Sequence, residues 1–418
     1  MKSALPARSL FPDFLTKEEM AFLVKVQGFC HDEVDPHSEK WEKEEHLPRE
    51  IFTEAGELGL MGVCVPKKSG GLGFSYAAYV CIIAEVAKHF AAFALDLAAH
   101  NALAVGHILG NCNDAQRRRM LPHLINGDWI AAWALTEPNA GSDSGAIQTT
   151  ATQTRSGWEI SGTKHFITQG RRADILVVIA STGTTDKGRK EISAFLVDKS
   201  QVQPVRKMHT CGMRASETSE LRFDKAKAEL LGERGHGQAA ALACLDKGRL
   251  GVAAVSLGLG RFAVDAAMKH ALTRQQFGKK LAEFQAIQFK LADAATELDA
   301  AELLIMRAAL MADRGMKHST ESAMAKLFAS EAGTRACNEA MQIHGGHGYS
   351  RDFPIERCWR DAKLCEIGEG SSEIQRVVIS RNLIKAFEET LNPPTAAAPL
   401  AQVDSIGPAL KKRQVALV

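Results

Sequence analysis

The sequence of 418 residues predicts a mainly α-helical protein with a β domain in its middle. Apolar residues recur at helical spacing up to about residue 130, short β-rich segments follow to about residue 231, and helical spacing then returns to about residue 391. A chain of this length is too long for one ordinary core. We expect a helical N-terminal domain at 1–130, a β domain at 131–236, a four-helix bundle at 237–391 and a tail at 392–418.

The N-terminal segment contains start and stop signals for its helices. Thr16 is a plausible N-cap before the first helix, and Gly59 is a plausible end for the second. His89, His100 and His107 lie among apolar residues, so we interpret them as packing or surface residues. The helices expected here span Lys17–Phe29, Pro48–Leu58, Tyr76–Phe90 and Ala94–Leu109.

The middle segment has the turn signals expected between the strands of an antiparallel sheet. Arg155–Gly157 resembles a hairpin turn, and the polar stretch Gly183–Lys190 separates two apolar runs. The fold expected from this pattern is a β-sandwich or barrel. The strands expected are Trp158–Thr163, Ile175–Ala180, Ile192–Val197 and Glu220–Phe223.

Long Ala- and Leu-rich segments joined by short connections predict the C-terminal bundle. Gly251, Gly258 and Gly260 lie inside the first of them, and no strand precedes them. They therefore indicate close helix packing and not a dinucleotide fingerprint. The helices expected span Ala239–Leu272, Leu281–Arg314, Thr320–Ile343 and Ser372–Leu391.

Composition limits the classes of partner. The formal net charge is +2 with acids and bases interspersed, so no basic stripe predicts nucleic-acid binding. Nine cysteines without a CxxC pair predict reduced thiols and no metal site. No apolar run approaches the roughly 18 residues of a membrane span, and the first residues lack the apolar region of a secretion signal. We expect a protein of the bacterial cytoplasm or the mitochondrial matrix that is not secreted.

The stretch Arg360–Arg376 contains the candidate catalytic base. Glu369 precedes Gly370 and two natural N-cap residues, Ser371 and Ser372, and an amphipathic segment follows. Glu369 should therefore lie in a tight loop at a helix N-terminus, a suitable place for a fixed base beside an anionic or electron-rich ligand. The alternative is a loop glutamate that is only solvated.

Four further stretches contain more Gly, Ser, Thr and charge than scaffolding needs. In the second of them, Thr168 follows two residues after Phe166, which fits a flat ring with an edge hydrogen bond. Arg274 suits a phosphate partner, and the glycines of the last stretch allow close backbone approach. Each stretch alone is also compatible with a plain loop or with packing. They span Ala134–Asp143, Gly162–Gly170, Arg274–Lys280 with Phe284 and Gln285, and Gln342–Tyr349.

Together and in this order, these four stretches resemble the acyl-CoA dehydrogenase family over about residues 15–390. The motifs are Leu-Thr-Glu-Pro-x-Ala-Gly-Ser-Asp, Arg-x-x-Phe-Gly-Lys, Gln-Ile-x-Gly-Gly-x-Gly, and Arg-Asp-Ala-Lys followed by Glu-Gly-Ser-Ser-Glu-Ile-Gln-Arg. The resemblance implies an N-terminal helical domain, a middle β domain and a C-terminal four-helix bundle. It also implies FAD, a homotetramer built as a dimer of dimers, and α,β-dehydrogenation of an acyl-CoA to the 2-enoyl-CoA, with an electron-transfer flavoprotein as acceptor.

The resemblance also implies roles for matching positions. Glu369 matches the base that takes the α-proton while the β-hydrogen leaves as hydride to flavin N5, and a desolvated pocket would raise its pKa toward the working pH. Contacts to CoA match Ser142, Asp246, Arg249 and Gly370. Contacts to FAD match Trp133, Leu135, Thr136, Ser142, Phe166, Ile167 and Thr168, with Ser371 and Glu373 on the adenosine-diphosphate side. Contacts to the FAD of a neighbouring subunit match Arg274, Gln276, Phe277, Phe284, Gln285, Gln342, Gly345 and Gly346.

The sequence departs from the family pattern near the base. Some members have their base at the position of Gly248, which cannot serve, so Glu369 is expected to be the only base. Gly368 stands where an aromatic residue is common, and Phe166 replaces a more usual Trp. Since Gly248 and Gly368 remove bulk near the first acyl carbons, we expect tolerance of a branched, cyclic or aromatic acyl group. The alternatives are a flavin-dependent oxidase or nitroalkane-type relative of the same fold, and a non-catalytic scaffold.

Overall fold

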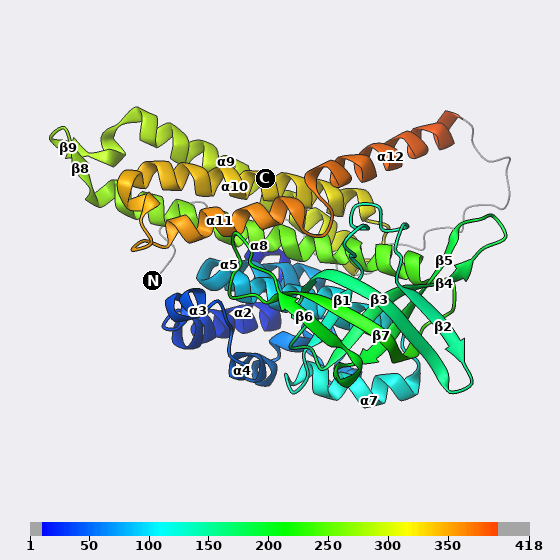
Figure 1. Ribbon diagram of the computed structural model, residues 1–418. Coiled ribbons are helices and arrows are strands. Elements are labelled where there is room, and N and C mark those ends of the chain that lie inside the picture. Colours follow the sequence, from blue (N-terminus) through cyan, green and yellow to red (C-terminus); the bar gives the residue numbers. More distant parts are fainter. Residues whose placement is uncertain (1–10, 392–418) are drawn as a thin grey trace. The chain divides into compact units, whose positions relative to one another are not determined.

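The computed structural model describes residues 11–391 and confirms the predicted fold class (Figure 1). The predicted tail at 392–418 lies outside the described residues. The chain divides into two compact units between Ile379 and Ser380, inside α12 (Ser372–Leu391). The described part of the second unit is the C-terminal portion of this helix, and the features below belong to the first unit. The boundaries expected at residues 130 and 236 stay predictions.

The N-terminal helices form largely where the sequence predicts them. The first predicted helix is α2, where Thr16 and Glu19 form a capping box. The two helices expected over residues 76–109 form on either side of a kink at Phe90 (φ −152°, ψ 102°) within α5, and the second continues as a π-helix over Ala99–Val105. The helices are α1 (Phe11–Phe14), α2 (Lys17–Phe29), α3 (Ser38–Glu44), α4 (Glu50–Leu58), α5 (Tyr76–Ala98), α6 (Gly106–Asn111) and α7 (Asp114–Ile125).

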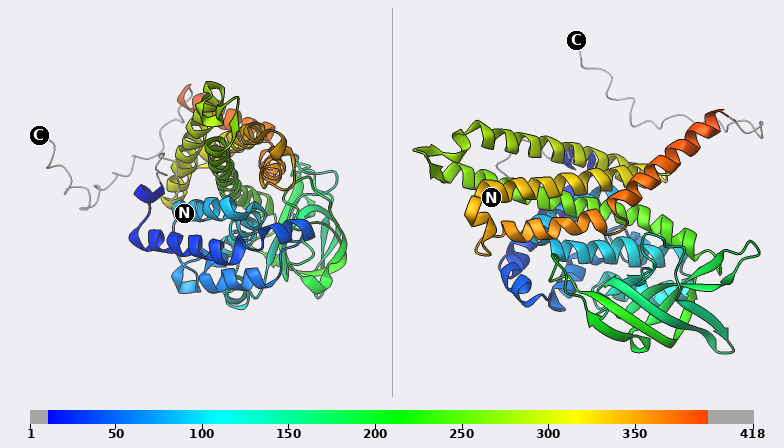
Figure 2. Two further views of the ribbon diagram at one scale, coloured as in Figure 1. Left: turned by 90° about the vertical axis from the view of Figure 1, so that its left-hand side faces the viewer. Right: turned by 45° about the horizontal axis from the view of Figure 1, so that its top comes forward.

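The β domain is a closed barrel, which decides between the two predicted alternatives. Its strands follow the order β1-β4-β2-β3-β7-β5, and β5 also pairs with β4, so the sheet closes on itself (Figure 2). All of the predicted strands form. Buried side chains such as Phe195 and Phe223 fill the interior. The strands are β1 (Ala131–Ala134), β2 (Thr150–Thr154), β3 (Gly157–Thr168), β4 (Ile175–Thr184), β5 (Lys190–Asp198), β6 (Gln203–Lys207) and β7 (Thr218–Leu231).

The C-terminal bundle contains one helix that the sequence analysis missed. The helix expected at Ser372–Leu391 forms as α12, and the additional helix α11 (Ile355–Ile367) packs along α8 and α10. Charged residues occupy much of α11 and leave only a narrow apolar stripe, which weakened the helical pattern. The other helices are α8 (Gly237–Thr273), α9 (Gln285–Asp313) and α10 (Ser319–His344), and a small hairpin of β8 (Gln275–Gln276) and β9 (Lys279–Lys280) connects α8 to α9.

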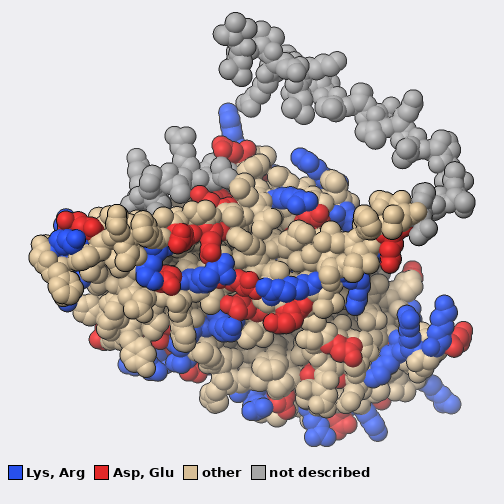
Figure 3. Space-filling model, turned by 90° about the horizontal axis from the view of Figure 1, so that it is seen from above, with Lys and Arg blue, Asp and Glu red and all other residues tan. Residues whose placement is uncertain are grey.

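Charged side chains of both signs are mixed over the molecular surface in the view of Figure 3. Lys and Arg lie beside Asp and Glu on this face, and neither sign gathers into a large patch. This agrees with the interspersed charges and the small formal net charge of +2 in the sequence.

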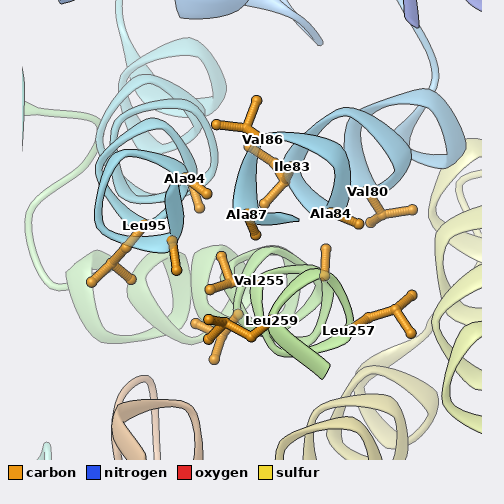
Figure 4. Close-up of a cluster of buried hydrophobic side chains, with 14 of the residues drawn as sticks. Val80, Ile83, Ala84, Val86, Ala87, Ala94, Leu95, Val255, Leu257 and Leu259 are labelled. Carbon is orange, nitrogen blue, oxygen red and sulfur yellow. The ribbon is translucent and has the colours of Figure 1, made fainter. Parts of the chain in front are cut away.

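The N-terminal domain and the bundle share one core, in which α5 packs directly on α8 (Figure 4). Val80, Ile83 and Ala87 of α5 lie in the same buried cluster as Val255 and Leu259 of α8. At Gly258 an added Cβ would lie 2.3 Å from the Ala84 carbonyl oxygen. The glycine therefore permits the close helix contact that the sequence predicted, and this contact fixes α8, which contributes to the site.

Two helical segments are longer and more apolar than the sequence analysis allowed. By length and composition, Tyr76–Asn111 and Gly237–Thr273 could cross a membrane, so the expectation that no run approaches such a length was wrong. In their most apolar windows, 83% and 78% of the residues are buried inside the protein. Such burial is typical of core helices, and α5 and α8 pack against each other.

Candidate active site

Glu369 lies in the tight turn between α11, which ends at Ile367, and α12, which begins at Ser372. Its backbone is left-handed (φ +54°), as is that of Gly370 (φ +95°). The Ser371 hydroxyl accepts the Ile374 N–H at 3.5 Å and caps the helix. The predicted position at a helix N-terminus is thus confirmed. Because a left-handed non-glycine residue is strained, the surrounding structure must hold this turn.

Two buried side chains hold the turn. Gln375 donates from Nε2 to the carbonyl oxygens of Glu369 (3.2 Å) and Gly370 (2.8 Å). Lys326 of α10 donates from Nζ to the Gly370 carbonyl at 2.7 Å. Both side chains are fully buried. Gly370 was expected to contact substrate, and its carbonyl oxygen already accepts hydrogen bonds from both side chains.

The carboxylate of Glu369 lies directly on α8 at Gly248. A Cβ added to Gly248 would lie 2.0 Å from Glu369 Oε2 and 2.6 Å from Leu103 Cδ2. Glu369 is half-buried as a residue, but its Oε2 atom is buried and has no hydrogen-bond partner within residues 11–391. Burial raises the pKa of Glu369 from 4.5 to about 7, against the opposing charges of Lys326 and Arg249. The carboxylate is thus close to half ionised at neutral pH.

Asp246 and Arg249, the predicted CoA residues, flank Gly248 on the same helix. Arg249 is 4% exposed and pairs with Asp246 at 2.6 Å, and Ser319 also donates to Asp246 at 2.9 Å. Burial lowers the pKa of Arg249. Its Nε atom is buried without a partner in the described chain. The structure therefore brings Arg249 near the base, with Asp246 as its ion-pair partner.

The stretches at 133–142 and 166–168, predicted to contact FAD, come together at the edge of the barrel. The Lys164 ammonium donates to the Leu135 carbonyl at 2.8 Å and pairs with Glu137 at 2.8 Å, and both charged side chains are buried. The His165 N–H donates to the Thr136 carbonyl at 2.8 Å. The strand β3 is thereby fixed against the loop that follows β1.

Side chains within these stretches face different surroundings. Phe166 is 58% exposed and left-handed (φ +56°), and Thr168 is half-buried. Ile167 points into the barrel core and Leu135 into a neighbouring core, so these two could meet a ligand only through the backbone. The indole N–H of Trp133 donates to His107 Nδ1 at 3.1 Å. Ser142 is exposed on the loop after β1.

A third group of predicted residues lies elsewhere in the chain. The Phe277 and Phe284 rings approach with centroids 6.4 Å apart, and Phe277 is 93% exposed. On α10, Gln342 is sixteen residues after Lys326, or about 24 Å along the helix. The structure therefore does not bring this group to the base within one chain. The members are Arg274, Gln276, Phe277, Phe284, Gln285, Gln342, Gly345 and Gly346, and they occupy the β8–β9 hairpin, the start of α9 and the end of α10.

The sequence analysis missed several residues around the site. Lys326 and the Glu137–Lys164 pair were not assigned any role, although Glu137 and Lys164 lie inside stretches that were singled out. Lys326 interrupts the Ala-rich apolar stripe of α10, and a charge on such a stripe is a signal that could have been read. Ser371 serves as the helix cap, and Glu373 is exposed.

Comparisons with known proteins cover nearly the whole chain. Residues 16–128, 132–226 and 235–384 match the family models for the N-terminal, middle and C-terminal domains of acyl-CoA dehydrogenases. An acyl-CoA dehydrogenase of Bacillus subtilis is 40% identical over 375 residues, covering 88% of this chain and 99% of the relative. A 3-(aryl)acrylate reductase of Clostridium sporogenes is 39% identical over 380 residues, covering 89% and 100%.

Among solved structures, the butyryl-CoA dehydrogenase of Megasphaera elsdenii superimposes with a TM-score of 0.86 at 36% identity, covering 88% of this chain and 99% of that one. With all domains matched in the predicted order, the chain belongs to the acyl-CoA dehydrogenase family, whose members are FAD-dependent oxidoreductases acting on the CH–CH bond of acyl-CoA.

Proposed function

We propose that this protein converts an acyl-CoA thioester to its 2-enoyl-CoA, with Glu369 as the base that removes the α-proton. The observation that carries this proposal is the Oε2 atom of Glu369, which is buried beside Gly248 and has no hydrogen-bond partner in the described chain. A carboxylate in an apolar site, free to accept and with a pKa of about 7, has the properties of a general base at neutral pH.

The turn that bears the base also offers an oxyanion donor. The backbone N–H of Glu369 donates no hydrogen bond within residues 11–391, so it is available to a thioester carbonyl oxygen. Removal of the α-proton places negative charge on that oxygen, and a donor fixed in a strained turn stabilises the charge without reorganisation. Arg249 adds a buried positive charge near the base.

The residues fit FAD, on which the family depends. Phe166 presents an exposed ring two residues before the half-buried Thr168 hydroxyl. A Cβ added to Gly345 or Gly346 would meet no atom within 4 Å, so a ligand can approach the backbone there closely. When bound, FAD would supply the acceptor for the β-hydrogen. In this proposal Thr136, Phe166 and Thr168 hold its ring system.

The second half of the FAD site requires another copy of the chain. Gln342 of this group lies about 24 Å along α10 from Lys326, which contacts the turn of the base. We infer that this is too far for the group to contact the same ring system on the same chain. The 93% exposed Phe277 and the open glycines suit the FAD of a neighbouring subunit. We therefore propose a homotetramer built as a dimer of dimers, with an electron-transfer flavoprotein as acceptor, located in the cytoplasm or the mitochondrial matrix.

Of the two glycines near the base, only Gly368 leaves room for the acyl group. The space at Gly248 is filled by the Glu369 carboxylate itself, so this glycine makes room for the base and not for substrate. At Gly368 the nearest atom to an added Cβ is the Leu364 carbonyl oxygen at 3.5 Å. Tolerance of a branched, cyclic or aromatic acyl group therefore rests on Gly368 alone. The similarity to a relative named 3-(aryl)acrylate reductase supports an aromatic group.

That relative also supports a second candidate function, the reduction of a 2-enoyl thioester. The same atoms serve both directions, because a protonated Glu369 can return its proton to the α-carbon. A flavin-dependent oxidase of the same fold differs only in its electron acceptor.

Anaerobic mixing of the FAD-loaded protein with a panel of straight, branched and aryl acyl-CoAs tests the proposal. We expect the flavin absorbance to bleach and the 2-enoyl-CoA to appear in equal amount. Subsequent reoxidation by an electron-transfer flavoprotein but not by air supports the dehydrogenase, and rapid reoxidation by air supports the oxidase. No bleaching by any acyl-CoA contradicts both.

A further inference from the structure

Lys326 is a lysine in the interior of the bundle. Its side chain is fully buried, and burial of an ammonium group costs several kcal/mol unless it is paired. A methionine would fill a similar volume without that cost. The neighbours on its own helix are small and uncharged: Ser322, Ala323, Ala325, Ala329 and Ser330 are all buried. The charge therefore has a role other than packing.

Lys326 differs in its partner from Lys164, another fully buried lysine. Lys164 pairs with the Glu137 carboxylate at 2.8 Å. Within residues 11–391, no carboxylate oxygen lies within ion-pairing distance of Lys326 Nζ, which instead donates to the Gly370 carbonyl at 2.7 Å. Gln375 donates to the same oxygen at 2.8 Å, so both lone pairs of this carbonyl are used.

The peptide held in this way is the strained one. Glu369 and Gly370 both have positive φ, and a left-handed non-glycine residue costs of the order of 1–3 kcal/mol. This conformation places the carboxylate on Gly248. Without the hydrogen bond from Lys326, the turn can relax toward ordinary backbone angles and carry the carboxylate away from α8.

We propose that Lys326 is a positioning residue for the base: by holding the Gly370 carbonyl, its ammonium group fixes the left-handed turn that lays the Glu369 carboxylate on Gly248. This inference rests on the proposed function, in which Glu369 removes the α-proton.

The charge of Lys326 adds an electrostatic effect. Four ionisable side chains act on Glu369: Lys326 of α10, Arg249 and Cys244 of α8, and Tyr79 of α5. Burial raises the pKa of Glu369, and the positive charges of Lys326 and then Arg249 limit that rise. Burial lowers the pKa of Lys326 to about 8, with Cys365 and Glu366 of α11 also acting on it. Lys326 thus stays mostly protonated at pH 7. If its removal left the carboxylate buried, the pKa of Glu369 would rise, whereas a carboxylate carried away from α8 regains water and its pKa falls, because burial is the larger cause of the shift.

The test compares Lys326→Met, Lys326→Arg and a control, Lys290→Met, which removes a half-exposed lysine of α9 that pairs with Glu339. For Lys326→Met we expect kcat at pH 7 to fall at least ~10-fold, with KM and FAD content unchanged. The midpoint of the pH profile of kcat should move down, because the displaced carboxylate regains water. Lys326→Arg should restore much of kcat and the midpoint, and Lys290→Met should resemble the parent.

A measurement that does not need turnover separates this inference from the proposed function. With ¹³C-labelled glutamate, the difference between the spectra of the parent and Glu369→Gln isolates the Glu369 carboxyl, and its titration gives the pKa directly. If Lys326→Met leaves this pKa unchanged or raises it, or lowers kcat only together with FAD content, the inference is wrong. A parent that titrates as described but never bleaches with acyl-CoA contradicts the proposed function alone. If the methionine variant does not fold, Lys326→Gln replaces it in both measurements.

Discussion

Substitution of Gly248 by alanine should displace the base without touching it chemically. The added Cβ would lie 2.0 Å from Glu369 Oε2, and ordinary van der Waals contact begins at 3.4 Å, so the carboxylate must retreat by about 1.4 Å. Leu103 Cδ2 at 2.6 Å blocks relief on its side. A misplacement of about 1 Å at a reacting group costs about 100-fold in rate. We therefore expect kcat for Gly248→Ala to fall by about two orders of magnitude.

The assay is anaerobic flavin bleaching by acyl-CoA, with FAD content and thermal unfolding measured alongside. The control is Gly28→Ala in α2, because no atom lies within 4 Å of that added Cβ. Combining Gly248→Ala with Glu369→Asp shortens the side chain by one methylene and should restore part of the lost rate. If Gly248→Ala retains parental kcat, the carboxylate does not need its place on α8, and the geometric reasoning fails.

Three further predictions follow from the charges around the site. The value of kcat should rise with pH through about 7 as Glu369 loses its proton, since the ionised form is the base; a flat profile from pH 6 to 8 would contradict the assignment. Because burial raises the pKa of Glu369 from 4.5 to about 7, the native state binds more protons than the unfolded state between these values, and stability falls as pH rises. Glu369→Gln cannot ionise and so avoids this loss of stability. In denaturant unfolding, the variant should therefore be more stable than the parent by about 3 kcal/mol at pH 8, and the difference should vanish below pH 4. An equal difference at both pH values would exclude this explanation. Lys164→Met leaves Glu137 buried without its cation and should cost about 3–5 kcal/mol of unfolding free energy, whereas the double variant with Glu137→Gln should lose less; equal losses would show that the pair is not coupled.

Helices and strands were predictable where apolar residues recurred at one constant spacing. The capping box at Thr16, the end at Gly59 and the glycines of α8 were all local signals that the structure confirms. The helix α11 was missed because charges cover most of its surface and its apolar stripe is narrow. The closure of the barrel was not predictable, since β4 must pair with both β2 and β5, and no local pattern encodes the two pairings together.

The site was predictable in its position but not in its supports. The turn containing Glu369 follows from cap residues and a glycine, which are local signals. Its contacts with Lys326 and Gly248 join α10 and α8 to that turn across long stretches of sequence. Such contacts arise only when the bundle folds, so the sequence could mark Gly248 as unusual but gave the wrong reason for it: the glycine accommodates the base.

The most direct test follows α-proton exchange with an acyl-CoA analogue whose third chain atom has no hydrogen, so that proton removal is the only step available. In D₂O, NMR should show that the FAD-loaded parent exchanges the α-hydrogen rapidly and that Glu369→Gln slows this exchange by orders of magnitude. Equal exchange rates in the two proteins would show that another group removes the proton, and the role assigned to Glu369 would be wrong.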